Sequence, residues 1–211
     1  MSFAPVHRIE LAHCPATAWK NGGGLTRELL TWRAAHSAGT QDDPSHWDLR
    51  VSVADIERDG PFSSFPGIDR GFAVLQGAGV VLSMASPEEA PTQDDLTVGP
   101  AGEALRFGGE LRVGCQLRDG PTRDLNFMVR RERGRLHMMR ASPGSCWGSG
   151  LLWKGIFCWD AGHLQGHLQG HQAMFDVQGA SLLWCDDLQG SCGDFIWHSE
   201  GLAYWLGWEP R

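Results

Sequence analysis

The stretch FAVLQGAGVVL, residues 72–82, places an apolar run on each side of a Gln-Gly-Ala-Gly segment. Short apolar runs separated by glycine are typical of two strands joined by a tight turn. A second stretch, MFDVQGASLLW at 174–184, repeats the same order around Gln-Gly-Ala. The two stretches together predict two similar β units in one chain.

The repetition continues downstream of both stretches. AGEALRF at 101–107 and CGDFIWH at 192–198 each contain a small residue, a glycine, an acidic residue and then an apolar run. A small open sheet is only marginally stable, and closure into a barrel removes its edges. This order is similar to the cupin barrel, so we expect an all-β fold of tandem cupin-like β-barrels, a bicupin, in one compact chain. We expect one barrel over 1–110 and the other over 111–211, with strands exchanged between them.

The composition agrees with a β fold. The 28 glycines and 11 prolines leave few windows long enough for an uninterrupted helix. In HWDLRVSV, residues 46–53, the apolar Leu49 and Val51 alternate with Arg50 and Ser52. Alternation with a period of two predicts a strand that buries one face and carries polar groups on the other.

The charge of the chain limits its partners. A formal net charge of −7 disfavours nucleic acids and anionic membranes, whose binding draws on clustered Lys and Arg. No apolar run approaches the roughly 20 residues that span a bilayer, and the first residues contain no apolar stretch of signal-peptide length. The six cysteines form no CxxC pair, which in a non-secreted chain is typical of reduced thiols. We expect a cytoplasmic protein without disulfides, with no nucleic-acid partner and no membrane partner.

The usual cupin metal ligands are not matched. The first cupin motif carries His-x-His and a following Glu, whereas Gln76 to Ala85 contains no histidine, and in the second half only His198 stands near a ligand position. A lone histidine is more often structural than ligating. We therefore expect no metal centre and no cofactor.

A tandem repeat, HLQGHLQGHQ at 163–172, spaces His163, His167 and His171 four residues apart. On a helix these side chains would form a metal-binding face, but the two interior glycines disfavour that helix. A slipped duplication in a surface loop is the favoured interpretation, and metal binding by the three histidines stays open.

A candidate binding segment is WKNGGGLTRELL, residues 19–30, where three glycines follow Lys20 and Asn21. Glycine loses more conformational entropy on folding than any other residue, so the triplet indicates unusual dihedral angles or close approach to a ligand. The backbone N–H groups at Gly22 and Gly23 could form an anion-binding nest. A P-loop is excluded because no GK[ST] follows the glycines.

The residues after the glycines have the pattern of a strand. Alternation places Thr26 and Glu28 on one face and Leu25 and Arg27 on the other. Asn21 could then converge with Thr26 and Glu28 on one pocket. A hairpin turn with a polar outer face is equally compatible with this segment.

A second candidate segment is ADIERDGPFSSFPGIDRGF, residues 54–72. Its Asp-Gly, Pro-Phe and Phe-Pro-Gly sequences favour turns, so its rigidity must come from those turns and from inward packing of Phe62 and Phe65. Arg70 lies at the entrance to the following strand. A guanidinium held by a rigid loop is well suited to bind a carboxylate through two hydrogen bonds.

Three motifs together resemble the HutD/Ves family. They are WKNGGGLTRE at 19–28, ADIERDGPFSSFPGIDR at 54–70 and DLNFMVRR at 124–131. The resemblance covers essentially the whole chain and implies a bicupin without an established catalytic metal, often encoded with bacterial histidine-utilisation genes. It further implies a small-molecule-binding regulator that limits expression of that pathway, with urocanate or N-formylglutamate as candidate ligand. The Ves branch is named for a stress response, and the choice of branch stays open.

The leading hypothesis is a non-enzymatic protein that binds a small carboxylate metabolite and modulates histidine utilisation. Arg70 would pair with the carboxylate, polar side chains would bind the rest of the ligand, and two phenylalanines would seal one wall. No catalytic residue is assigned, and the expected ligand-binding residues are Lys20, Asn21, Gly22, Gly23, Thr26, Glu28, Phe62, Phe65 and Arg70.

Two alternatives belong to other classes. A cupin-type isomerase or hydrolase could use Glu28 as a general base beside Lys20, although cupin barrels suggest this only by analogy of fold. A protein-interaction module is the third class. Trp205 and Trp208, two of the ten tryptophans, suit a homodimer interface as well as a core.

Overall fold

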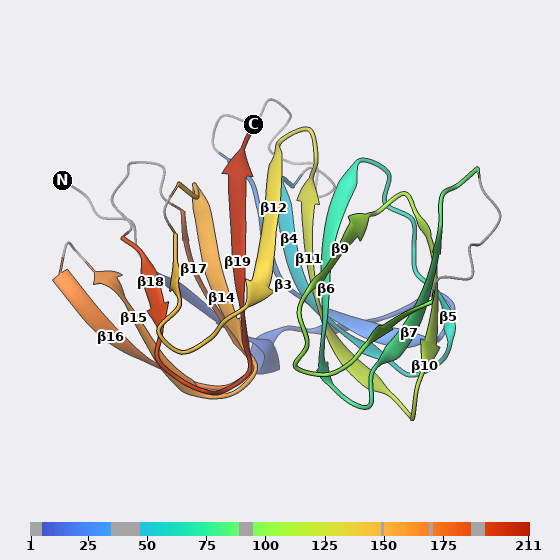
Figure 1. Cartoon of the computed structure of the whole chain (residues 1–211), viewed down its shortest axis with the longest axis horizontal. Coiled ribbons are helices and arrows are strands. Elements are labelled where there is room, and N and C mark those ends of the chain that lie inside the picture. The colour runs from blue at the N-terminus through green and yellow to red at the C-terminus, as the bar shows by residue number, and fades with distance from the viewer. Residues whose placement is uncertain (1–5, 35–46, 89–94, 149, 169–170, 187–192) are drawn as a thin grey trace. The chain divides into compact units, whose positions relative to one another are not determined.

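The structure is a computed structural model that describes residues 6–34, 47–88, 95–148, 150–168, 171–186 and 193–211. The regular elements of these residues are β-strands and one short 3-10 helix, η1 (Leu11–His13). The chain divides into two compact units (Figure 1). The N-terminal unit is Pro15–Gly134, and the C-terminal unit combines Arg135–Arg211 with Met1–Cys14. The all-β prediction is confirmed.

The N-terminal unit contains two antiparallel sheets. The six-stranded sheet has the order β2-β3-β4-β11-β6-β9, and the four-stranded sheet has the order β5-β10-β7-β8. The strands of the first are β2 (Ala16–Ala18), β3 (Gly24–Trp32), β4 (Leu49–Ile56), β11 (Thr122–Arg130), β6 (Ile68–Gln76) and β9 (Leu105–Gly108). Those of the second are β5 (Gly60–Pro61), β10 (Arg112–Leu117), β7 (Val80–Ala85) and β8 (Leu96–Val98).

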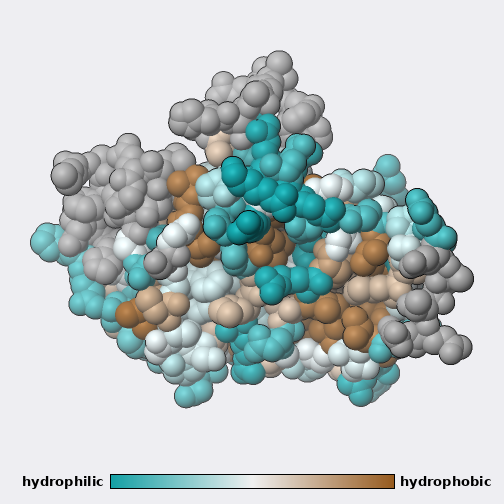
Figure 2. All heavy atoms as spheres, turned by 45° about the horizontal axis from the view of Figure 1, so that its top comes forward, coloured by the Kyte–Doolittle hydropathy of each residue, from teal (hydrophilic) through white to brown (hydrophobic). Residues whose placement is uncertain are grey.

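Apolar side chains from both sheets form the core of this unit. Phe72 and Val74 of β6 pack with Val80 and Leu82 of β7, and all four are fully buried. The two sheets therefore face each other as a sandwich. In the space-filling view, apolar and hydrophilic residues both reach the surface of this unit (Figure 2).

The C-terminal unit also pairs two antiparallel sheets, in the orders β1-β17-β14-β19-β12 and β13-β18-β15-β16. Their core is dominated by buried aromatic and aliphatic side chains such as Trp197, Trp205 and Phe195. The strands of the first sheet are β1 (His7–Glu10), β17 (Ser181–Asp186), β14 (Trp153–Cys158), β19 (Ala203–Pro210) and β12 (Gly134–Arg140). Those of the second are β13 (Cys146–Trp147), β18 (Phe195–Trp197), β15 (Gly162–Leu168) and β16 (His171–Val177).

The division between the units differs from the boundary expected between residues 110 and 111. Strands β10 and β11 lie beyond that boundary, yet they pair with β7, β4 and β6 of the N-terminal unit. At the other end of the chain, β1 pairs with β17, so the first strand belongs to the C-terminal unit. Sheet pairing, which is not visible in a local pattern, sets the division after Gly134.

The two repeated stretches form strand, turn and strand. In the first, β6 leads into β7 through Gly77 and Gly79, whose φ angles are 100° and 98°. In the second, β16 leads into β17 through Ala180, with φ 53°. Each turn carries the chain from one sheet of its unit to the other. Within the described residues no sheet closes on itself, so the structure shows paired sheets where closed barrels were expected.

Two smaller expectations are wrong. The HLQG repeat does not form a surface loop, because most of it lies in the paired strands β15 and β16, where His163 is opposite Asp176. Cys185 is disulfide-bonded, so the thiols are not all reduced.

In the described part of the chain no helix is long and apolar enough to cross a membrane.

Candidate functional site

The three glycines after Lys20 form the turn between β2 and β3. Gly22 has φ +68°, a left-handed conformation that side chains rarely adopt. The N–H of Gly23 donates a 3.0 Å hydrogen bond to Oδ1 of Asn21, which closes the turn locally. A Cβ on Gly24 would lie 2.2 Å from the carbonyl oxygen of Asp55 on the neighbouring strand. Turn conformation and close strand approach therefore account for the triplet.

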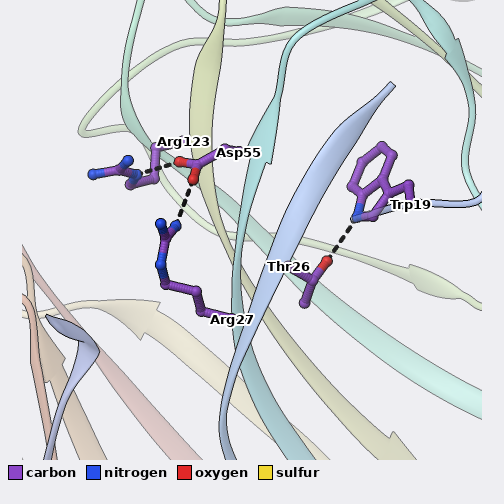
Figure 3. Close-up of polar contacts among 5 residues, drawn as sticks. All are labelled: Trp19, Thr26, Arg27, Asp55 and Arg123. Carbon is purple, nitrogen blue, oxygen red and sulfur yellow. Dashed lines mark hydrogen bonds and ion pairs between the residues drawn. The ribbon is translucent and has the colours of Figure 1, made fainter. Parts of the chain in front are cut away.

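Strand β3 places its polar side chains on two faces, as its alternation predicts. Figure 3 shows Thr26 and Arg27 on opposite sides of the strand. Thr26 accepts a 2.8 Å hydrogen bond from Nε1 of Trp19. On the other side, Asp55 accepts hydrogen bonds from Arg27, at 2.6 Å, and from Arg123. Burial raises the pKa of Asp55, but the two arginines outweigh that effect and hold the pKa below its ordinary value.

A cavity of about 920 Å³ lies in the N-terminal unit, on the Thr26 side of β3. It brings together seven of the nine predicted ligand-binding residues: Lys20, Asn21, Thr26, Glu28, Phe62, Phe65 and Arg70. Gly22 and Gly23 are not in its lining. Their predicted role as an anion-binding nest stays a prediction. The N–H of Gly23 already donates its hydrogen bond to Oδ1 of Asn21. The volume is in the range of small-molecule pockets.

Arg70 is the most deeply buried charged group of this lining, with 7% of its surface exposed. Its Nη2 donates a 2.7 Å hydrogen bond to Oδ1 of Asn126. Its guanidinium carbon lies 5.1 Å from the ring centres of Phe62 and Phe107 and 5.8 Å from that of Phe65. Aromatic faces attract a cation at such distances but do not neutralise it.

The charge of Arg70 is incompletely compensated. Its Nε–H is buried and has no hydrogen-bond acceptor within the described residues. Burial, followed by the nearby charge of Arg50, lowers the pKa of Arg70 to about 10, so the side chain is still cationic at neutral pH. A buried donor without a partner costs about 1–3 kcal/mol, more when charged, and an anion in the cavity would remove that cost.

The cavity lining is more positive than the rest of the chain. It contains three cations, Lys20, Arg50 and Arg70, and one anion, Glu28, in a chain whose formal net charge is −7. Nε of Arg50 lies 2.9 Å from Oε2 of Glu28. Because the Glu28 side chain is 48% exposed, solvent screens this pair.

Several residues of the cavity lining were not among those expected from the sequence. Ser52 and Asn126 lie opposite each other on β4 and β11, and Asn126 also lies opposite Phe72 on β6. This register places Asn126 on the cavity face. Trp19 and Met128 line the cavity as well. Alternation in DLNFMVRR was the available signal, but pairing was needed to assign its faces.

Asp124 is a second unusual polar group of this unit. It is fully buried, and its Oδ2 accepts a 2.8 Å hydrogen bond from Oγ1 of Thr122. Its Oδ1 has no hydrogen-bond donor among the described residues. Burial raises its pKa to about 7; the bond from Thr122 opposes the shift, and the charge of Asp55 adds to it. Asp124 is not part of the cavity lining.

Among the described residues, no group of three or more His, Cys, Asp or Glu could hold a metal ion.

Comparison of the fold places the chain in a class of all-β proteins with cupin-like structural neighbours. An oxalate decarboxylase of Lactobacillus farciminis matches with a TM-score of 0.62 and 10% identity over 97% of this chain and 86% of that chain, which shows likeness of fold alone. HutD from Pseudomonas fluorescens SBW25 matches with a TM-score of 0.75 and 26% identity over 98% of this chain and 100% of that chain.

The family model for HutD matches residues 11–191, and the chain belongs to the HutD family. An uncharacterized 21.2 kDa protein in the hutC 3′ region of Pseudomonas putida is 36% identical over 124 residues, 59% of this chain and 58% of that protein. Protein Ves of Citrobacter koseri is 32% identical over 126 residues, 59% of this chain and 58% of that protein. The chain thus spans less than two thirds of the length of these curated relatives.

Proposed function

We propose that the chain binds a small carboxylate-bearing metabolite in the cavity of its N-terminal unit, and that Arg70 pairs with the carboxylate. The observation that carries this proposal is the buried guanidinium whose Nε–H has no acceptor and whose neighbours are an amide and three aromatic rings. A carboxylate would supply both the missing acceptor and the missing charge.

The other lining groups fit the remainder of such a ligand. Phe62 and Phe65 offer apolar walls, while Asn21, Ser52 and Thr26 offer polar groups in the same lining. Small-molecule sites commonly combine an apolar lining with a few convergent polar groups. The enzyme alternative has less support, because the charged contact described for Glu28 is with Arg50.

The biological role that we propose is modulation of histidine utilisation. Membership of the HutD family and the relative in the hutC 3′ region support it. Urocanate and N-formylglutamate are the candidate ligands, since each carries a carboxylate. An acidic chain is poorly suited to contact DNA directly, so binding of the pathway's inducer in the cytoplasm is the favoured route. Tandem cupin-like barrels are the architecture we propose for the two units.

Thermal unfolding with and without ligand tests the binding site. A ligand at about 100 times its dissociation constant adds roughly 2.7 kcal/mol of stability, and each kcal/mol raises Tm by about 2–4 °C at this chain length. We expect urocanate or N-formylglutamate to raise Tm in wild type and not in Arg70→Met. Arg106→Met is the matched control, because Arg106 is exposed and does not line the cavity.

A second variant, Arg70→Lys, controls for the case in which Arg70→Met does not fold. It keeps the charge but loses the planar fork, so we expect a ligand-induced shift that is reduced but present. A full shift in Arg70→Met would place the carboxylate elsewhere and overturn the proposed site.

A further inference from the structure

The cavity contains two arginines whose Nε–H groups both lack a hydrogen-bond acceptor. In the described part of the chain, Nε of Arg50 and Nε of Arg70 are both buried and have no hydrogen-bond partner. Both arginines line the same cavity. A single carboxylate at Arg70, as proposed above, would supply an acceptor for the Nε–H of Arg70. It would leave the Nε–H of Arg50 without one.

The sheet fixes the spacing of the two cations. Met128 on β11 lies opposite Arg50 on β4 and opposite Arg70 on β6. Residues opposite each other in adjacent strands point to the same face, so both guanidinium groups start from one face of the sheet, with Met128 between them. Two strand spacings correspond to about 10 Å between the Cα atoms. This separation allows the two groups to hold the two ends of one small ligand.

Glu28 is a weak counter-ion for Arg50. Oε2 of Glu28 lies 2.9 Å from Nε of Arg50. Nevertheless the Nε–H group has no hydrogen-bond partner, so the contact lacks the geometry of a hydrogen bond. The Arg50 side chain is 24% exposed and that of Glu28 is 48% exposed. Partly exposed ion pairs are typically worth only about 0–1 kcal/mol. A ligand anion with better geometry can therefore replace Glu28, whose carboxylate can turn into solvent.

We infer that the site is built for a dicarboxylate: Arg70 binds one carboxylate, and Arg50 binds the second after exchanging it for Glu28. This rests on the proposed function. Lys20 is a less suitable second group, because it is exposed at the β2–β3 turn, and an exposed ammonium loses strong hydration when it binds an anion. Arg50 also contributes to lowering the pKa of Arg70, which places the two charges within interaction range of each other. Two anionic groups would relieve that repulsion.

Calorimetric titration with two ligands of equal size tests this inference. Glutarate carries two carboxylates, and glutaramate replaces one of them with a neutral amide. We expect wild type to bind glutarate at least tenfold more tightly than glutaramate. In Arg50→Gln the two affinities should become equal through weaker binding of glutarate, while Arg106→Gln should keep the wild-type ratio.

Glu28→Gln gives a second variant with an effect of opposite sign. It removes the competitor for Arg50, so glutarate should bind several-fold more tightly than to wild type, with glutaramate unchanged. This result does not depend on whether Arg50→Gln folds. A general loss of structure would weaken both ligands and could not produce it.

The outcomes separate this inference from the proposed function. Equal affinities of wild type for glutarate and glutaramate, with both lost in Arg70→Met, would overturn the dicarboxylate inference and support the carboxylate site. A glutarate preference that persists in Arg50→Gln would also overturn the role of Arg50. If neither these two ligands nor urocanate or N-formylglutamate bound to wild type, both proposals would fail.

Discussion

Arg70 and Asn126 are 56 positions apart in the chain, and Nη2 of Arg70 donates a 2.7 Å hydrogen bond to Oδ1 of Asn126. The polar partner of this buried cation is thus a neutral amide. A carboxylate at the same place would complete an internal ion pair, whereas the amide orients the guanidinium and leaves its charge available.

Asn126→Asp tests whether that neutrality matters. The substitution changes the shape little and gives Arg70 a permanent counter-ion, so we expect carboxylate binding to weaken at least tenfold while Tm without ligand is maintained or raised. Titration calorimetry and thermal unfolding measure the two effects. Asn21→Asp adds the same charge at an exposed position of the cavity lining, where solvent screens it and a smaller loss is expected. Equal losses in the two variants would contradict a specific role for Asn126.

The glycine triplet allows a graded stability test. Gly24→Ala places a Cβ 2.2 Å from the carbonyl oxygen of Asp55, and overpacking of this kind costs about 1–3 kcal/mol. Gly22→Ala forces a side chain into a left-handed conformation, at roughly 1–2 kcal/mol. Gly60→Ala is the control, because its Cβ would meet nothing within 4 Å. Urea unfolding should show a change within about 0.5 kcal/mol for this control, and a Gly24→Ala variant as stable as the control would contradict the close strand contact.

Asp124 should make stability depend on pH. Its pKa is about 7 in the folded state and about 3.9 when unfolded. Between these values the unfolded chain has released the proton that the folded chain still holds, so the stabilisation present at low pH is lost as the pH rises toward 7. We expect Asp124→Asn to become progressively more stable relative to wild type from about pH 4 to pH 7. Urea unfolding at several pH values measures this difference, and the exposed Asp119→Asn should not reproduce it.

Asp55 should show the opposite dependence. Its pKa is held below the ordinary value, so the stability it contributes is present above the unfolded pKa of about 3.9 and lost as the pH falls through the lower folded value. Asp55→Asn leaves Arg27 and Arg123 without their shared carboxylate, and we expect a loss of about 1–3 kcal/mol at pH 7. The difference from wild type should shrink in strong acid. A constant difference across pH would mean that packing, and not charge, is responsible.

Local patterns predicted several residues of the cavity lining. Alternation after the glycines placed Thr26 and Glu28 on one face, and both line the cavity. The turn-rich loop before β6 placed Phe62 and Phe65 near Arg70, and the distances from the guanidinium to their rings confirm that proximity. These features depend on the dihedral preferences and spacing of neighbouring residues, which a single sequence contains.

The other features of the fold and the cavity could not be predicted from local patterns, because they depend on pairing between distant strands. Ser52 and Asn126 meet only through the register of β4 with β11, and a shift by one residue would turn Asn126 away. The limits of the units depend on the same information, since β1 pairs with a strand more than 170 positions later. The disulfide at Cys185 was also not expected, because the lack of a CxxC pair was taken to indicate reduced thiols.

The pairing of β1 with β17 also affects the order of events during synthesis. Residues 7–10 leave the ribosome before the other strands of their sheet, but their partners at 181–184 follow much later. Only β19 of that sheet is translated after them. At about 5–20 residues per second, the interval is on the order of ten seconds or more. The N-terminal unit can fold in that time, while the nascent chain carries an unpaired edge segment that must stay free of other strands until its partner emerges.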